Sequence, residues 1–198
     1  RQGTTKSPAG AAFTVNDAQR VDPVLADKLD TAAQALVTEA LANGKLAALA
    51  PCADTTLQGE KCAQDFLRSF GASAYRRPLS DEEVAFLTSG PGAAYHVGAD
   101  GYTYEDGIGL LLRVLLQQPA FLYTTELGPS ATTDTFDLTQ DEVATALSYL
   151  LTSAPPDAEL KQRASAGELA SPETRESEAK RLLASPAGRA RLVRVVQE

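Results

Sequence analysis

The pattern of apolar and polar positions is most distinctive between Thr103 and Glu126, where Ile108–Leu116 is apolar except for Arg113. Four polar or small positions recur at helical spacing and form one narrow stripe: Asp106, Gly109, Arg113 and Gln117. A helix that is apolar around most of its circumference must be covered on several sides. The stretch is also too short and too interrupted to span a bilayer. It therefore predicts a central helix, residues 104–118, inside a helical bundle.

The N-terminal half predicts further helices with defined ends. After an irregular lead-in over residues 1–21, Asp22 is followed by a proline at the first helical position. Helical periodicity then runs to Asn43, which precedes a glycine and is a good C-terminal stop. A second helix is expected over Glu60–Tyr75, because the proline of Arg76-Arg77-Pro78 disfavours helix just before it.

Two capping boxes start later helices. The first spans Ser80–Glu83 and precedes a short helix with Val84, Phe86 and Leu87. The second spans Thr139–Glu142, and the helix after it carries its apolar residues on one face: Val143, Leu147, Leu150 and Leu151. Shorter helices are expected around residues 158–166, from residue 172 and from residue 186.

A linker-like stretch, Gly128–Asp137, divides the chain into two parts. Runs of β-branched residues are scarce, and only Thr132–Leu138 has any strand-like alternation. The expected fold is all-α, a multi-helix bundle of about seven or eight helices in two packed helical subdomains, residues 22–127 and 138–198. The subdomains are expected to pack through the central helix and the Val143–Leu151 helix.

Charge and composition exclude some classes of function. The formal net charge of −8 argues against a nucleic-acid binder, whose affinity depends on neutralising phosphates. No stretch is long and apolar enough to form a transmembrane segment. The chain has no methionine, and its first ten residues lack a basic-then-apolar signal peptide. We therefore expect a processed piece of a longer protein, from which any export signal has been removed.

The two cysteines, Cys52 and Cys62, stand on either side of a short polar loop. They predict a disulfide and an exported, oxidising setting, whether periplasmic, outer-membrane-associated or extracellular. In the chain-entropy model such a loop adds about 2–3 kcal/mol of stability. The alternative is two reduced structural thiols in a cytosolic protein. Two cysteines without a nearby histidine are too few for a metal site.

Three side chains are weak candidates for chemistry. The only histidine, His96, lies beside Tyr95 in a glycine-containing loop and has the side chain for acid–base or metal chemistry. One histidine without further ligands supports neither zinc nor haem attachment, so a solvent-exposed loop residue is the simpler interpretation. Arg113 is expected to pair with Asp106 or with a carboxylate on a neighbouring helix. No catalytic elbow, phosphate loop or dinucleotide fingerprint is present, so no catalytic, cofactor-binding or metal-binding residue is assigned.

Two groups of basic residues have a structural alternative to ligand binding. Arg76 and Arg77 have the geometry to hold a carboxylate or phosphate bidentately. Acidic residues follow at 81–83, however, and a helix C-terminus attracts arginine on its own. We therefore favour pairing with those acidic residues or with the carbonyls that end the helix. For the second group we favour a solvated helix face over contact with an acidic partner or with the acidic remainder of this chain: Lys180, Arg181, Arg189, Arg191 and Arg194.

Two segments resemble known domains. Cys62–Glu126 resembles the family called domain of unknown function fifteen-ninety-five through Arg76-Arg77-Pro78-Leu79-Ser80-Asp81-Glu82-Glu83, Tyr104-Glu105-Asp106-Gly107 and Pro119-Ala120-Phe121-Leu122-Tyr123. Leu138–Val196 resembles its usual companion, domain of unknown function fifteen-ninety-two, through Leu147-Ser148-Tyr149-Leu150-Leu151, Pro155-Pro156-Asp157, Leu160, Gly167, Leu169, Leu182-Leu183 and Pro186. The matched residues are expected to act structurally in turns, caps and core, notably Arg76, Arg77, Pro78, Gly107, Pro119, Phe121, Pro155 and Pro156.

The resemblance implies a large, exported, multidomain parent protein of a kind found in planctomycetes and myxobacteria and often described as cytochrome-like. Some members carry a c-type haem motif elsewhere. This chain has no Cys-x-x-Cys-His, so no cofactor is expected in it, and a c-type haem would sit only on another segment or partner. The family pattern usually begins before Arg1 and continues beyond Glu198, so the second subdomain is expected to be truncated. The family has no agreed activity.

These observations favour a non-catalytic helical scaffold or interaction module of a larger exported protein, associated with the cell envelope and with redox partners. Its partner is expected to be the remainder of its own polypeptide or a redox partner protein. The alternative is part of an enzyme, an oxidoreductase or hydrolase, whose active site is completed by a missing segment or partner chain. An enzyme predicts convergent polar side chains, such as Tyr95, His96 and Arg113, around a pocket. A scaffold predicts an exposed apolar patch.

Overall fold

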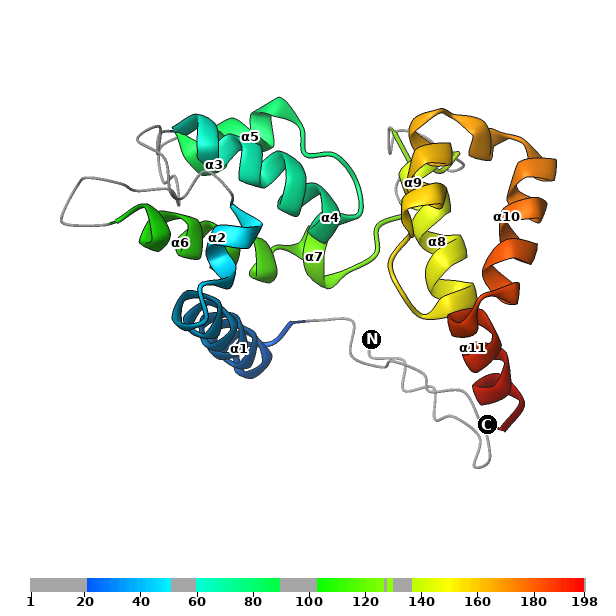
Figure 1. Ribbon diagram of the computed structural model, residues 1–198, viewed down its shortest axis with the longest axis horizontal. Coiled ribbons are helices and arrows are strands. Elements are labelled where there is room, and N and C mark those ends of the chain that lie inside the picture. The colour runs from blue at the N-terminus through cyan, green and yellow to red at the C-terminus, as the bar shows by residue number, and fades with distance from the viewer. Residues whose placement is uncertain (1–20, 51–59, 90–102, 127, 130–136, 198) are drawn as a thin grey trace, which may run out of the picture.

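The computed structural model describes residues 21–50, 60–89, 103–126, 128–129 and 137–197, and within these the protein is all-α without a strand, as predicted. Eight of the helices in this part have seven residues or more: α1, α3, α5, α6, α8, α9, α10 and α11. Figure 1 shows two groups of helices, α1–α7 and α8–α11, joined by the chain that follows α7. None of the described helices is long and apolar enough to cross a bilayer.

The first group consists of α1 (Pro23–Ala42), α2 (Lys45–Leu49), α3 (Glu60–Phe66), a π-helical turn η1 (Leu67–Gly71), α4 (Ala72–Tyr75), α5 (Asp81–Thr88), α6 (Tyr104–Gln117) and α7 (Pro119–Leu122). The second group consists of α8 (Gln140–Thr152), α9 (Ala158–Ser165), a 3₁₀ turn η2 (Glu168–Ala170), α10 (Pro172–Ala184) and α11 (Pro186–Gln197). Here α3, η1 and α4 run on without a break and occupy the predicted helix at 60–75. The predicted helix at 23–43 is α1, with Asn43 as its C-cap. The short helix α2 was not predicted.

The central helix of the first group is α6, as the apolar pattern predicts. Ile108, Leu111 and Leu115 have no exposed surface, and α1, α2 and α7 all contact this helix. Its start is fixed by a capping box that the sequence analysis did not single out. The Thr103 amide donates to the Asp106 carboxylate over 2.8 Å, and the Asp106 amide donates back to the Thr103 hydroxyl. Burial on several sides explains why the apolar run is nearly continuous.

The polar stripe of α6 lies beneath α1. At Gly109, an added Cβ would stand 3.1 Å from Val37 Cγ1 of α1. One turn further along α6, the Arg113 side chain forms an ion pair with Asp30 of α1. The stripe thus combines a close approach of two backbones with one pair of opposite charges, and it accounts for how α1 is positioned over α6.

The second group has its own core, built from Leu160, Leu169, Leu182 and the small residues Ala144 and Ala164. The inward face predicted for α8 is partly wrong. Leu150 is 68% exposed, whereas Ala144 and Ser148 on the same helix are buried. The other three predicted residues, Val143, Leu147 and Leu151, are partly buried against the second core, so the prediction fails at Leu150 alone.

The predicted packing of the two subdomains through α6 and α8 is also wrong. The helix pairs with the most extensive contact all lie within one group or the other, and α6 with α8 is not among them. The surface of α6 is already covered by α1, α2 and α7, and the apolar side chains of α8 pack within the second core. No large apolar face of either helix is left over for the other.

Candidate functional site

The residues that end α4 and begin α5, Arg76–Glu83, form the feature that we call the arginine turn. Arg76 has φ +60°, the left-handed conformation that terminates α4. Its guanidinium donates to the carbonyl oxygens of Ala120 and Tyr123, both over 2.7 Å, and to that of Phe121 over 3.3 Å. The last carbonyls of a helix have no partner within the helix, so Arg76 supplies donors to the end of α7.

Arg77 has a different partner in the arginine turn. Its two terminal nitrogens donate to the two Glu83 oxygens over 2.7 and 2.9 Å, which is the bidentate geometry of a strong charge-assisted pair. This contact holds the pKa of Glu83 below its usual value, and a hydrogen bond from the Ser80 amide acts in the same direction. The Ser80 hydroxyl completes the predicted capping box by accepting from the Glu83 amide. The Arg77 guanidinium also lies 5.7 Å from the ring centroid of Tyr75.

Tyr75 and Asp141 have shifted acidities near this turn. Burial raises the pKa of Tyr75 to about 12, and the nearby negative charge of Glu83 adds to the shift. Burial also raises the pKa of Asp141, the second residue of α8, although the Arg77 charge opposes that shift. At neutral pH Tyr75 is therefore a neutral phenol.

Of the three weak candidates from the sequence, only Arg113 lies among the described residues. Arg113 donates from Nε and from a terminal nitrogen to the two oxygens of Asp30, over 2.8 and 2.6 Å, so its partner is on a neighbouring helix. Tyr95 and His96 lie outside the described residues. Since two of the three candidates are not described, the structure does not test whether they form a site.

Of the two cysteines, only Cys62 lies among the described residues. Cys62 is buried in α3, and its Sγ lies 2.7 Å from the hydroxyl of Tyr104, which is also buried. Cys52 lies outside the described residues, so the pairing of the two cysteines stays a prediction. Within the described part of the chain, no cluster of three or more histidine, cysteine or acidic side chains has the arrangement needed to hold a metal ion.

The other motif residues occupy turns and helix starts. Pro119 is the first residue of α7, and Phe121 packs against the first core. Gly107 is buried in the first turns of α6, and Pro156 is buried just before α9. The two remaining prolines of the motif, Pro78 and Pro155, are exposed.

A buried charge was missed from the sequence. Glu178 of α10 is only 2% exposed, and its two oxygens face two arginines. Arg163 Nε lies 2.8 Å from one oxygen, and Arg181 lies 2.6 Å from the other. Arg181 also donates to Asp157 over 2.7 Å, and this hydrogen bond lowers the pKa of that carboxyl. The surrounding sequence is typical of a solvated helix, and only the arginine three residues after Glu178 hints at a local pair.

The basic residues of the last two helices therefore fall into two sets. Arg181 belongs to the buried ionic cluster, and Lys180 pairs with Glu176 over 2.6 Å on the surface of α10. The other three lie on α11: Arg189, Arg191 and Arg194. Among the described residues, no carboxylate lies within ion-pair distance of these three arginines.

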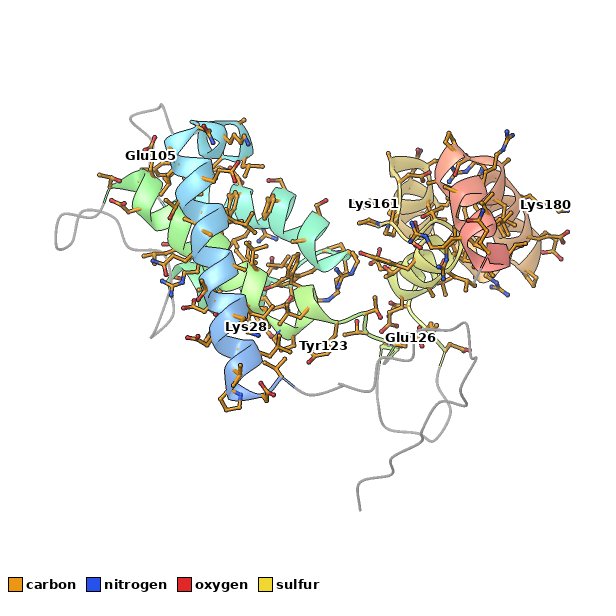
Figure 2. The ribbon with its side chains drawn as sticks, turned by 90° about the horizontal axis from the view of Figure 1, so that it is seen from below. Lys28, Glu105, Tyr123, Glu126, Lys161 and Lys180 are labelled. Carbon is orange, nitrogen blue, oxygen red and sulfur yellow. The ribbon has the colours of Figure 1, made fainter. Side chains whose placement is uncertain are left out.

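A groove of about 530 Å³ lies where the two groups of helices face one another, and we call it the interdomain groove. Figure 2 shows Lys161 on the side of the second group that faces the first, and Lys180 on the far side. The groove is lined by Ser69, Ala72, Ser73, Arg76, Arg77, Pro78, Asp141, Ala158, Lys161, Gln162 and Ser165. It brings the arginine turn together with α9 and the first turn of α8.

Comparison with known families confirms the resemblance. Residues 62–126 match the family model PSD5, described as a protein of unknown function (DUF1595), and residues 138–198 match PSD4, described as a protein of unknown function (DUF1592). The chain carries both of these domains. The PSD5 match covers most of α3 to α7, with the arginine turn in it, and the PSD4 match covers α8 to α11. No curated protein and no solved structure gives a significant match.

Proposed function

We propose that this pair of PSD5 and PSD4 domains is a non-catalytic helical interaction module of a larger exported protein. In this proposal the module docks through α11 onto another segment of its own polypeptide or onto a partner protein, such as a redox protein. The surface that receives α11 combines apolar side chains with acidic ones. The exported setting and the Cys52–Cys62 disulfide are part of the same proposal.

The observation that carries this proposal is the exposed apolar surface on the last turns of α11. Leu192 and Val193 are 48% and 54% exposed, and Val195 and Val196 are 41% and 85% exposed. Single exposed aliphatic residues are ordinary on a protein surface, but four within five residues form a contiguous patch of the kind that marks interaction sites.

The charge on the same helix indicates the chemistry of the partner. Residues 186–197 contain three arginines and no acidic residue. The chain as a whole has a net charge of −8, so α11 is a basic apolar helix on an acidic protein. Like charges across an interface are costly, and opposite charges raise the association rate. An acidic rim around an apolar surface therefore fits α11.

The charged motif residues also support a structural role. Arg76 is engaged by backbone carbonyls, and Arg77 is held bidentately by Glu83. The enzyme alternative needs reactive side chains that converge on a cavity, and Arg113, its one described candidate, is in an ion pair with Asp30. We therefore favour the interaction module.

Site-specific photo-crosslinking in the full-length natural protein tests the proposal. A photoreactive amino acid at Val193 should give a defined product whose partner peptide lies outside residues 1–198. The matched control places it at Lys28, an exposed position on α1. A yield from position 193 no higher than from position 28 would contradict the proposed docking. A third variant, Arg194→Glu with the photoreactive residue at 193, should lower the yield if the partner surface is acidic.

A further inference from the structure

We propose that the interdomain groove binds a small oxyanion, which bridges α4 on one side and α9 on the other. The shared chemistry is a negatively charged oxygen-bearing group, either a carboxylate or a tetrahedral phosphate or sulfate. This inference does not depend on the docking role of α11, because the groove and α11 are formed by different surfaces.

The lining of the groove carries an excess of positive charge. Three basic side chains face the groove, Arg76, Arg77 and Lys161, against one acidic side chain, Asp141. This excess of positive charge is local, since the whole chain has a net charge of −8. A cleft lined by one sign of charge concentrates ligands of the opposite sign.

Two of these positive charges have no carboxylate partner among the described residues. Arg77 is paired with Glu83, but Arg76 is bonded only to neutral carbonyls in the described part of the protein. Lys161 has no carboxylate within ion-pair distance among the described residues. Its Nζ has one contact, with the Ser73 hydroxyl, at 3.4 Å. This distance is long for a hydrogen bond, so Lys161 retains donors for a closer acceptor.

Both walls of the groove supply hydrogen-bond donors. The Ser73 hydroxyl accepts from Lys161 and keeps its own proton for a ligand oxygen. Gln162 adds an amide group from α9, next to Lys161. By contrast, the hydroxyls of Ser69 and Ser165 donate to carbonyls of their own helices. The available donors therefore come from α4 and α9, and an oxyanion accepts from several donors at once.

The backbone beside the groove is also unusual. Ser69 lies in the π-helical turn η1, and Ala72 and Ser73 follow it in α4. Single π-helical turns inside α-helices occur frequently at functional sites. This feature does not identify the ligand, but it places an irregular helix at the groove wall that supplies Ser73.

The test is a titration of the ¹⁵N-labelled chain with inorganic phosphate and, in parallel, with acetate, at constant ionic strength set by sodium chloride. We expect saturable amide shifts confined to residues 69–78, the first turn of α8 around Asp141, and residues 158–165. Lys161→Gln should weaken the apparent affinity by about tenfold, because it removes a charge-assisted hydrogen bond. Lys180→Gln removes the same charge from the far side of the second group and should leave the affinity unchanged.

The two ligands distinguish the kinds of oxyanion. Tighter binding of phosphate identifies a tetrahedral anion, and tighter binding of acetate identifies a carboxylate; either result supports the groove as an oxyanion site. Shifts that do not saturate with either ligand would overturn the proposal. Equal affinities of Lys161→Gln and the unmodified chain, or equal losses in Lys161→Gln and Lys180→Gln, would also overturn it. The spectrum of each variant without ligand reports whether it is folded.

Discussion

At the scale of single residues, two non-glycine residues in the described part of the chain adopt the left-handed backbone conformation: Arg76 and Ser153. This conformation costs a residue with a Cβ roughly 1–2 kcal/mol. At Arg76 the side chain makes several hydrogen bonds that offset the cost. At Ser153, the C-cap of α8, the backbone amide bonds to Tyr149 but no side-chain hydrogen bond offsets it.

Ser153→Gly should therefore stabilise the protein. Glycine adopts this conformation without strain, but it has more backbone freedom to lose on folding. We expect a net gain of about 0.5–1 kcal/mol in the free energy of unfolding, measured by denaturant titration followed by circular dichroism. A loss of stability would show that the serine side chain contributes a contact to the cap.

The Arg77–Glu83 pair predicts a pH dependence. Because the folded pKa of Glu83 is lowered, its stabilising contribution is present above its unfolded pKa and is lost as the pH falls through the folded value. Glu83→Gln keeps an oxygen for the Ser80 amide but removes the charge. The variant should be less stable than the unmodified protein at pH 6. The difference should narrow as the pH falls below the ordinary glutamate pKa of about 4.3 and through the lowered pKa of folded Glu83.

Thermal unfolding at a series of pH values checks this prediction. Both partners are about one-third exposed, at 37% each, so solvent screens the pair and the difference at pH 6 should be modest. A difference that stays constant from pH 6 to pH 3 would mean that the substitution acts through packing or the cap, and not through the charge.

At the scale of helices, α10 and α11 meet at a very close backbone contact. A Cβ added at Gly188 would stand 2.2 Å from the Leu182 carbonyl oxygen and 2.8 Å from the Leu183 Cα. Both are backbone atoms, so the clash is relieved only if α11 moves relative to α10. Gly109 is the natural comparison, because its added Cβ would meet the Val37 side chain at 3.1 Å.

Gly188→Ala should therefore destabilise the protein by about 2 kcal/mol or more, despite the better helix propensity of alanine. Gly109→Ala should lower the free energy of unfolding by less than about 1 kcal/mol. The better helix propensity of alanine nearly offsets the cost of a small shift of the Val37 side chain. Denaturant titration of the two variants side by side provides the measurement. Similar losses in both would mean that α11 shifts easily against α10.

Helix positions were largely predictable from local signals, whereas helix faces and partners were not. The capping boxes at Ser80 and Thr139 mark the observed starts of α5 and α8, and the proline before Leu79 marks the end of the preceding helix to within a few residues. The exposure of Leu150 could not be found this way, because it shares the apolar pattern of Val143, Leu147 and Leu151, which do pack against the second core. Likewise, Asp30 and Arg113 are far apart in sequence, so no local pattern connects them.

At the scale of the whole molecule, the two groups of helices have separate cores. Each core is formed by residues of one group only, and the helix pairs with the most extensive contact all lie within a group. We therefore expect the groups to unfold as two units with different midpoints. Amide signals of residues 21–126 and of residues 137–197, followed in parallel through a urea titration, should disappear at different concentrations. Coincident loss of both sets would contradict the independence of the two cores.

Features that depend on how the helices are arranged in space could not be predicted from the sequence, whereas the fold class could. The all-α class and the order of two helical parts follow from periodicity and from the proline and glycine stops. The interdomain groove does not, because its walls come from residues 69–78 and 158–165, which are brought together only by the arrangement of the groups. The buried Glu178 also depends on α9 and α10 lying side by side, with Arg163 on one and Arg181 on the other.

The charged residues of the arginine turn stabilise the fold, and Arg76→Gly tests this claim most directly. Glycine relieves the left-handed strain at this position, so the substitution isolates the side chain that bonds to the carbonyls of α7. We expect the free energy of unfolding to fall by about 2 kcal/mol, while Ser153→Gly, the matched change at the other left-handed residue, raises it. If Arg76→Gly is as stable as the unmodified protein or more stable, the hydrogen bonds from Arg76 to the carbonyls of α7 do not stabilise the fold, and the claim is contradicted.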